Sequence, residues 1–346
     1  MKKMTESIEK SVWKVRKEER LPLWKGGEYT RKTGKFKPNI TAYIHTEDET
    51  VRPGILVVPG GGYCVVSCTE GEIVAKEFFL RGYNTFVVTY TTDLLIQEPL
   101  KLQPLKDLSR AMVMVRKNSD YFHVNPHMLT ICGFSAGGHL CGSLAVHYDE
   151  KELEETGEYR EISNRPDAVI LGYPVITSGE FCHKDSFQVL LGANASSEEL
   201  EYMSLEKHVS EKTPPSFLWQ TATDELVPVE NSILFAESCR KKKVPAALHI
   251  FESGKHGMSV ANEEWAYGDF TGLYTMEQFF ETLQGLVDSG KTLSAPFDQA
   301  GMLPPGTDVK KIYGDYVKIV RDDHPDEEIA QWPEMADRWL KKRFGK

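Results

Sequence analysis

Three residues whose side chains together make a nucleophilic site, Ser135, Asp224 and His256, occur in that order along this chain of 346 residues. A serine hydroxyl is a poor nucleophile until a histidine takes its proton, and the imidazole needs a carboxylate that holds its tautomer and stabilises its charged form. The separations leave room for helices that bring the three residues to one edge of a sheet. We therefore take them as candidate nucleophile, acid and base.

The residues around Ser135 form the pattern Gly-x-Ser-x-Gly between an apolar run, Leu129 to Phe134, and a stretch of helix formers. A serine on such a strand-to-helix turn is held in a strained backbone conformation that points its hydroxyl away from the sheet. Gly133 and Gly137 lack side chains that would make the strand and the helix collide. Because five-residue patterns also occur by chance, the rest of the chain has to supply the context.

The other two residues follow predicted strands. Asp224 comes after the apolar run Ser216 to Thr221, and His256 comes after Ala247 to Glu252. In this type of sheet the acid follows a later strand and the histidine follows the last one, so both positions agree with the topology. An Asp at such a place also serves as a turn or helix-capping residue. Two further carboxylates compete for the role of the acid, Glu225 and Asp93.

Three consecutive glycines, Gly60 to Gly62, follow the apolar run Gly54 to Pro59. Backbone amides aimed at the developing oxyanion stabilise the transition state by roughly 3 to 4 kcal/mol per donor. Because glycine has no side chain to block the approach, Gly61 and Gly62 are the predicted donors, together with the Ala136 amide at the helix N-terminus. The alternative is a plain tight turn.

Strand-like and helix-like stretches alternate along the chain, which predicts an α/β fold with a central, mostly parallel sheet and helices on both faces. The predicted strands are 40–45, 54–59, 84–90, 129–134, 168–175, 216–221 and 247–252. The predicted helices are 70–81, 105–118, the stretch after Ser135, 229–242 and 331–344.

The chain is expected to form a single domain, 1–346, with three additions to this core. Residues 1–30 are predicted to form an N-terminal arm, with a short amphipathic helix followed by an extended piece. Residues 177–214 are expected to form either a partial cap over the carboxyl edge of the sheet or a connection that packs on the surface. Residues 261–324, with a helical piece near 274–287, are a C-terminal insertion before the closing helix.

The charge balance limits the classes of partner. With 41 Lys and Arg against 51 Asp and Glu, the formal charge is −10. An acidic surface disfavours nucleic acid, anionic membranes and polyanionic substrates, and it leaves neutral small molecules open.

The six cysteines are expected to be buried free thiols, and no second Cys or His pair completes a zinc set, so no metal is predicted. Residues 1–20 are charged throughout and lack the apolar stretch of a secretory signal. No run approaches transmembrane length. A cytoplasmic location is the resulting expectation.

The chain resembles the α/β-hydrolase superfamily, and more narrowly its acetyl-esterase and acetyl-xylan-esterase-like esterases and lipases, which are related to the hormone-sensitive lipase group. The resemblance covers about residues 20 to 260, and 332–344 looks like that family's closing helix. Four motifs carry it: Pro-Gly-Gly-Gly-Tyr at 59–63, Gly-Phe-Ser-Ala-Gly-Gly at 133–138, Thr-Asp-Glu-Leu-Val-Pro at 223–228 and Lys-His-Gly at 255–257. The chain departs from the pattern at Pro59, where many lipase-type relatives carry histidine.

The resemblance implies a serine esterase that cleaves short acyl esters through an acyl-enzyme, with acetylated sugars or xylo-oligosaccharides as the favoured small-molecule substrates and no cofactor. Ser135, Asp224 and His256 would be its triad, and the amides of the three residues named above would form its oxyanion hole. Tyr63 and His183 are candidate substrate-binding residues. The 261–324 insertion would cover the site or build a contact between copies in a homo-oligomer.

Two rival functions remain open. One is a serine peptidase of the prolyl-oligopeptidase type, which would use the same residues on an amide bond. The other is a catalytically silent carbohydrate-binding protein that keeps the fold, since a fold alone does not fix a function.

Overall fold

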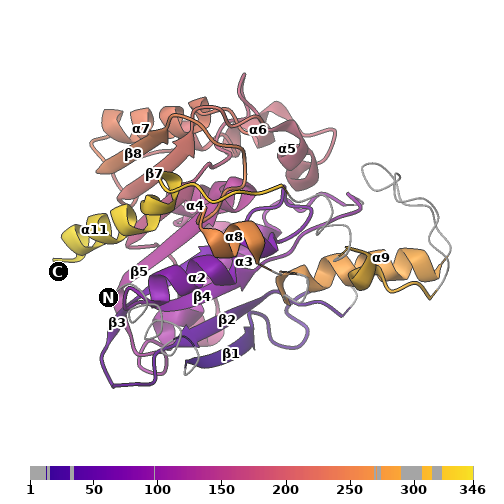
Figure 1. Cartoon of the computed structure of the whole chain (residues 1–346), viewed down its shortest axis with the longest axis horizontal. Coiled ribbons are helices and arrows are strands. Elements are labelled where there is room, and N and C mark those ends of the chain that lie inside the picture. Colours follow the sequence, from indigo (N-terminus) through magenta and orange to yellow (C-terminus); the bar gives the residue numbers. More distant parts are fainter. Residues whose placement is uncertain are drawn as a thin grey trace.

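The computed structural model describes residue 13 and residues 16–31, 35–96, 98–268, 270, 274–289, 306–313 and 322–345. Its framework within these residues is an eight-stranded sheet in the order β1-β2-β4-β3-β5-β6-β7-β8 (Figure 1). The strands are β1 (Lys17–Pro22), β2 (Asn39–Ile44), β3 (Arg52–Val58), β4 (Asn84–Thr89), β5 (Val124–Phe134), β6 (Ala168–Gly172), β7 (Ser216–Thr221) and β8 (Ala246–Phe251).

The strands from β4 across to β8 pair in parallel, whereas β1 with β2 and β2 with β4 pair antiparallel. Parallel neighbours need crossover connections, and the helices between the strands supply them. The predicted α/β fold with a mostly parallel sheet is therefore confirmed.

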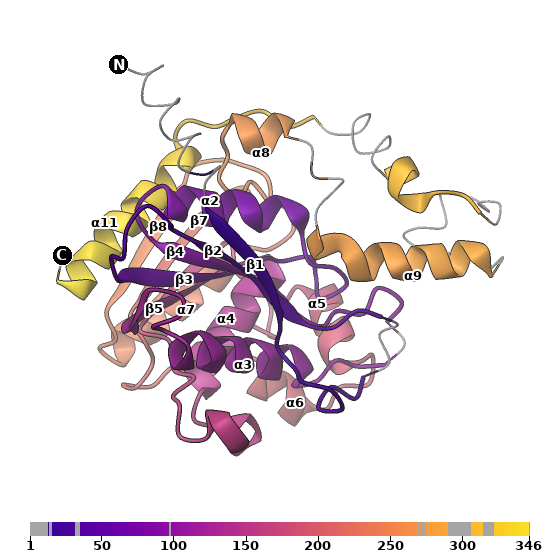
Figure 2. The ribbon, with the colours of Figure 1, turned by 90° about the horizontal axis from the view of Figure 1, so that it is seen from below.

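Helices cover both faces of the sheet, as predicted (Figure 2). One face carries α2 (Glu72–Phe79) and α11 (Trp332–Phe344), and the other carries α3 (Gln103–Lys117), α4 (Ser135–His147) and α7 (Glu230–Lys241). Successive side chains of a strand point to opposite faces, and β3 divides between two apolar cores accordingly. Its alternate residues fall into one core (Leu56, Val58) or the other (Ile55, Val57).

The N-terminal arm adds a strand that the sequence pattern did not predict. β1 pairs with β2 from Lys17 opposite Ile44 to Pro22 opposite Asn39, and so forms one edge of the sheet. The expected extended piece is thus part of the sheet itself. The amphipathic helix predicted for the first part of 1–30 lies outside the described residues, apart from the single residue Trp13.

Two predicted strands differ from the structure by three or more residues at one end. β5 begins at Val124 rather than at 129. β6 ends at Gly172 rather than at 175, because Tyr173 has a φ of +35° and leaves the extended conformation. This turn brings the Tyr173 side chain beneath the site described below.

The two inserted segments contain short helices. Residues 177–214 carry α5 (Lys184–Leu191) and α6 (Ser197–Tyr202), and a capping box between Ser196 and Glu199 begins the second of these. The 261–324 segment carries α8 (Glu263–Tyr267) and α9 (Glu277–Asp288).

α9 is attached to the sheet at the end where β1 and β4 lie (Figure 2). Arg20 of β1 donates two hydrogen bonds to Glu277, at 2.9 and 2.7 Å, and Gln278 donates to the carbonyl of Thr92 at 2.5 Å. The parts of this segment at 290–305 and 314–321 lie outside the described residues. Whether the segment covers the site or joins copies of the chain stays a prediction.

The described residues include no helix that is long and apolar enough to cross a membrane. Across the same residues, no group of three or more His, Cys, Asp or Glu side chains is arranged to hold a metal ion. All six cysteines are free thiols.

Candidate active site

Ser135 is the first residue of α4 and follows directly on β5. Its φ is +52°, a left-handed conformation that a non-glycine residue rarely adopts. The turn is possible only without side chains beside it: a Cβ on Gly133 would lie 2.3 Å from the carbonyl oxygen of Gly137, and one on Gly137 would lie 2.2 Å from that of Val58. The predicted strand, sharp turn and helix are therefore present, and they present the serine at the carboxyl edge of the sheet.

His256 joins the serine to the predicted acid. Its Nε2 lies 2.9 Å from Ser135 Oγ, and its Nδ1 lies 2.8 Å from Asp224 Oδ2. The amides of Leu226 and Val227 donate to the other carboxylate oxygen at 3.0 and 2.9 Å. A carboxylate can only accept, so Nδ1 carries the proton and Nε2 is left to accept from the serine hydroxyl. The structure thus brings together all three residues that the sequence placed far apart.

The competing carboxylates have other partners. Glu225 accepts the backbone N–H of His256 at 3.2 Å and so anchors the loop rather than the imidazole. Asp93 accepts the amides of Leu95 and Glu98 at 3.0 and 3.2 Å. Of the three carboxylates considered, Asp224 is the one on the imidazole.

The glycine loop after β3 faces the serine. Gly61 and Gly62 have φ values of +118° and +62°, and a Cβ on Gly61 would lie 2.4 Å from the carbonyl oxygen of Val65. Within the part of the chain that the structure describes, the amides of Gly61, Gly62 and Ala136 have no hydrogen-bond acceptor. Ala136 lies in the first turn of α4, where amides have no partner inside the helix. The Gly60 amide, by contrast, donates to Glu70 at 2.7 Å.

Tyr63 has a different place from the one expected of a substrate-binding side chain. It is only 1% exposed, and its hydroxyl lies 2.7 Å from Nδ1 of His139. The other ring nitrogen of His139 lies 2.9 Å from the carbonyl oxygen of Met203, so it donates there and Nδ1 accepts from Tyr63. Burial lowers the pKa of His139 to about 4, which keeps the ring neutral. The Tyr63 side chain therefore packs beneath the glycine loop and does not form a pocket wall.

His183 precedes α5, and its Nδ1 lies 2.8 Å from the hydroxyl of Ser186. The same hydroxyl lies 4.0 Å from the position that a Cβ on Gly62 would take. Burial lowers the pKa of His183, and the nearby His256 lowers it further. The start of the 177–214 segment therefore lies beside the glycine loop and near the catalytic candidates.

Two residues of the site were not predicted. Glu70 is 4% exposed and accepts hydrogen bonds from the Gly60 amide and from the hydroxyl of Tyr173, each at 2.7 Å. The Tyr173 ring meets the His256 ring edge to face, with 4.9 Å between centroids. In the sequence Glu70 begins the predicted helix 70–81 and Tyr173 belongs to the predicted strand 168–175, so neither shows a signal that separates it from an ordinary surface acid or core aromatic.

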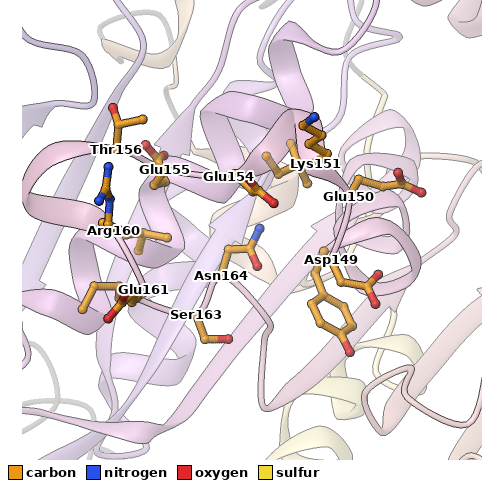
Figure 3. Close-up of a pocket in the computed structure, with 14 residues that line it drawn as sticks. Asp149, Glu150, Lys151, Glu154, Glu155, Thr156, Arg160, Glu161, Ser163 and Asn164 are labelled. Atoms are coloured by element: carbon orange, nitrogen blue, oxygen red, sulfur yellow. The ribbon is translucent and has the colours of Figure 1, made fainter.

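A separate cavity of about 690 Å³ opens between the loops that follow α4 (Figure 3). The lining is rich in carboxylates, including Asp149, Glu150 and Glu154, and contains none of the predicted site residues. A helix rises 1.5 Å per residue, so the 13 residues of α4 separate this end from Ser135 by roughly 20 Å. The cavity is therefore not part of the candidate active site.

The site has the features that define the α/β hydrolases as a class. A serine with positive φ lies between a strand and a helix, the acid and the histidine follow the last two strands, and backbone amides without an acceptor lie beside the serine. Residues 40–239 match the BD-FAE family, and the chain belongs to that family of α/β-hydrolase-type esterases. The predicted resemblance is thereby confirmed.

Individual relatives agree with this assignment. The chain is 51% identical over 257 residues to endo-1,4-beta-xylanase B of Butyrivibrio fibrisolvens, which covers 74% of this chain and 40% of that protein. It is 31% identical over 209 residues to the acetylxylan esterase of Xylanibacter ruminicola, which covers 59% and 40% respectively. The chain thus spans less than half the length of these two relatives.

One solved structure is matched over nearly its whole length. The acetyl ester-xyloside bifunctional hydrolase from Caldicellulosiruptor lactoaceticus is 35% identical, with a TM-score of 0.66, and the match covers 77% of this chain and 96% of that one.

Proposed function

We propose that this protein is a serine esterase that removes short acyl groups, acetyl above all, from sugars or xylo-oligosaccharides. The observation that carries the proposal is His256, hydrogen-bonded to Ser135 on one side and to Asp224 on the other. Membership of an esterase family and the relatives named above support it.

In the proposed reaction, Ser135 Oγ attacks the acyl carbonyl while His256 Nε2 takes its proton. The negative oxygen is stabilised by the amides of Gly61, Gly62 and Ala136. The imidazolium then gives its proton to the leaving alkoxide, which departs as the sugar alcohol, and an acyl-serine remains. Water, activated by the same imidazole, releases the carboxylic acid and restores the serine.

The site favours ester over glycoside hydrolysis, although one relative is a xylanase. A glycosidase generally needs two carboxyl groups that flank the scissile bond. The carboxylates near Ser135 have other partners: Asp224 accepts from the imidazole, Glu225 accepts the His256 backbone N–H, and Glu70 accepts from the Gly60 amide and the Tyr173 hydroxyl. A neutral acetylated sugar also agrees with the charge of −10, which disfavours anionic substrates.

Labelling with a serine-directed fluorophosphonate, read by intact mass, tests the nucleophile. We expect one adduct on the wild-type protein and none on Ser135→Ala, which should fold normally and lose turnover. No adduct on well-folded wild-type protein would contradict the proposal.

A substrate panel then tests the class of reaction. Acetyl, butyryl and octanoyl esters, acetylated xylo-oligosaccharides, aminoacyl amides and a nitrophenyl xyloside would be compared by kcat/KM. We expect the acetyl esters to be preferred. Faster cleavage of the amides would establish the peptidase alternative, and sugar binding without any hydrolysis would establish the silent one.

A further inference from the structure

A buried carboxylate, Glu70, lies under the glycine loop, and among the described residues its hydrogen-bond partners include no cation. Glu70 Oε2 accepts the Gly60 N–H at 2.7 Å, and Oε1 accepts from the Tyr173 hydroxyl at the same distance. A carboxyl group enclosed in this way is costly to keep charged, so its retention beside the nucleophile calls for a physical reason.

The directions of the hydrogen bonds indicate the charged form. The Tyr173 hydroxyl accepts the backbone N–H of Ser259 at 3.1 Å, so its own proton points to Glu70. The Gly60 amide can only donate, so both carboxylate oxygens of Glu70 accept. The pKa of Glu70 is raised, because the effect of burial exceeds that of the bonds from Tyr173 and Gly60, which act in the opposite direction.

The series of contacts connects two loops that the reaction uses. Gly60 begins the glycine loop, and Ser259 lies three residues after His256 in the histidine loop. The Tyr173 ring contacts the imidazole edge to face, and its left-handed backbone conformation places it there. Glu70 is thus hydrogen-bonded to the first loop directly and to the second through Tyr173.

We infer that Glu70 and Tyr173 are positioning residues that hold the glycine loop and the histidine loop in place relative to each other. The negative charge of Glu70 also favours the imidazolium form of His256. The role rests on the proposed function, because it concerns the proton that His256 takes from Ser135. Neither residue touches the reacting atoms.

The charged groups around the pair set the sign of the effect. Tyr90 and Tyr173 face Glu70, and burial keeps the pKa of both phenols well above the usual value, so they stay neutral. The imidazole of His256 is the group facing Glu70 that becomes a cation in the reaction. Asp224 is hydrogen-bonded to that imidazole, Glu225 accepts the His256 backbone N–H, and His183 lies near enough for His256 to lower its pKa. Removing the charge of Glu70 should therefore make the imidazolium that forms at His256 less stable.

The test compares Glu70→Gln and Tyr173→Phe with a matched control, Glu72→Gln. Glu72 lies on α2 two residues further on, is partly exposed and lies 3.7 Å from Arg16, away from the site. For each folded variant, kcat and KM for an acetyl ester would be measured across pH, together with the melting temperature. Fluorophosphonate labelling of the wild-type protein checks the proposed function separately.

We expect Glu70→Gln to lower kcat by about 10- to 100-fold with little change in KM, as for other losses of transition-state positioning. The acidic limb of its kcat/KM profile should move to lower pH. Tyr173→Phe should lower kcat but leave the acidic limb in place, because the charge of Glu70 remains. Glu72→Gln should behave as the wild type.

Two results would overturn the inference. One is a folded Glu70→Gln enzyme with wild-type kcat and an unmoved acidic limb. The other is a Tyr173→Phe variant that loses only melting temperature while its kcat stays unchanged, which would assign the pair to packing. If the wild-type protein takes no fluorophosphonate label, it is the proposed function that fails instead.

Discussion

A residue of the site could be predicted from the sequence where the backbone geometry at its position requires a particular residue type. Gly61 and Gly133 are glycines because a Cβ there would collide with a carbonyl oxygen, and a reader of the sequence sees that requirement directly. Ser135 stands in a motif that such glycines define. Glu70 carries no comparable trace, since an acid at the start of a helix is ordinary and its burial follows only from the packing of distant segments.

Gly61→Ala tests the glycine loop at the residue scale. The Cβ would lie 2.4 Å from the carbonyl oxygen of Val65, and φ is +118°, so the loop has to move and its amides with it. We expect kcat for an acetyl ester to fall by about 100-fold, as when one oxyanion donor is lost.

Gly82→Ala is the matched control for this substitution. Gly82 has a φ of +90° with nothing within 4 Å of an added Cβ, so it carries a similar backbone strain without a collision and away from the site. It should lose about 1 kcal/mol of stability and no activity. Wild-type kcat in folded Gly61→Ala would remove this loop from the proposed oxyanion hole.

Elements with apolar cores were predictable, and those held by backbone pairing or by capping were not. The buried strands β3 to β7 appear in the sequence as apolar runs, because both of their faces are covered. β1 reads Lys-Glu-Glu-Arg-Leu-Pro, a charged stretch that becomes a strand only because the β2 edge is there to pair with it. α5 and α6 are short helices, whose weak periodicity resembles that of a loop.

α4 gives a prediction on acid stability, because it carries the buried His147. The ring donates to the carbonyl oxygen of Tyr202 at 2.9 Å and stacks on the Tyr202 ring, and burial lowers its pKa from 6.5 to about 4. Between these two pH values the unfolded chain binds a proton that the folded chain does not. Stability should therefore fall as the pH drops through this window, by about 1.4 kcal/mol per pH unit.

His147→Gln isolates this contribution. Glutamine still offers an N–H to the Tyr202 carbonyl but does not titrate, and every other group titrates equally in both proteins. Urea unfolding at pH 7 and pH 5 should show a loss of stability about 2 kcal/mol smaller in the variant. Equal losses in the two proteins would show that His147 is protonated while the chain is folded.

At the scale of the whole molecule, the sheet gathers the candidate residues at one edge, and the overall charge surrounds them. Parallel strands end at the same edge, which is why residues separated along the chain meet there. The order of strands and helices in the sequence was enough to predict that these residues lie close together, although no individual contact between them could be predicted. It did not predict how the inserted segments pack, because their contacts depend on a few side chains, such as Trp265, whose indole N–H donates to the Gly257 carbonyl at 3.1 Å beside His256.

The charge of −10 predicts how the rate depends on salt. Asp185 and Glu225 are exposed near the site, so an ester that carries a carboxylate approaches against a negative field, whereas a neutral acetyl sugar does not. The Debye length shortens from about 30 Å at 0.01 M salt to about 10 Å at 0.1 M, so added salt screens this repulsion. We expect kcat/KM for the anionic ester to rise with salt, while that for the neutral ester stays within about twofold.

Initial-rate assays of both esters at the two salt concentrations test this prediction. A cationic choline ester, whose rate should fall with salt, is the control for the sign of the effect. An anionic ester that reacts equally fast at both concentrations would mean that the local field at the mouth of the site is not negative, despite the charge of the whole chain.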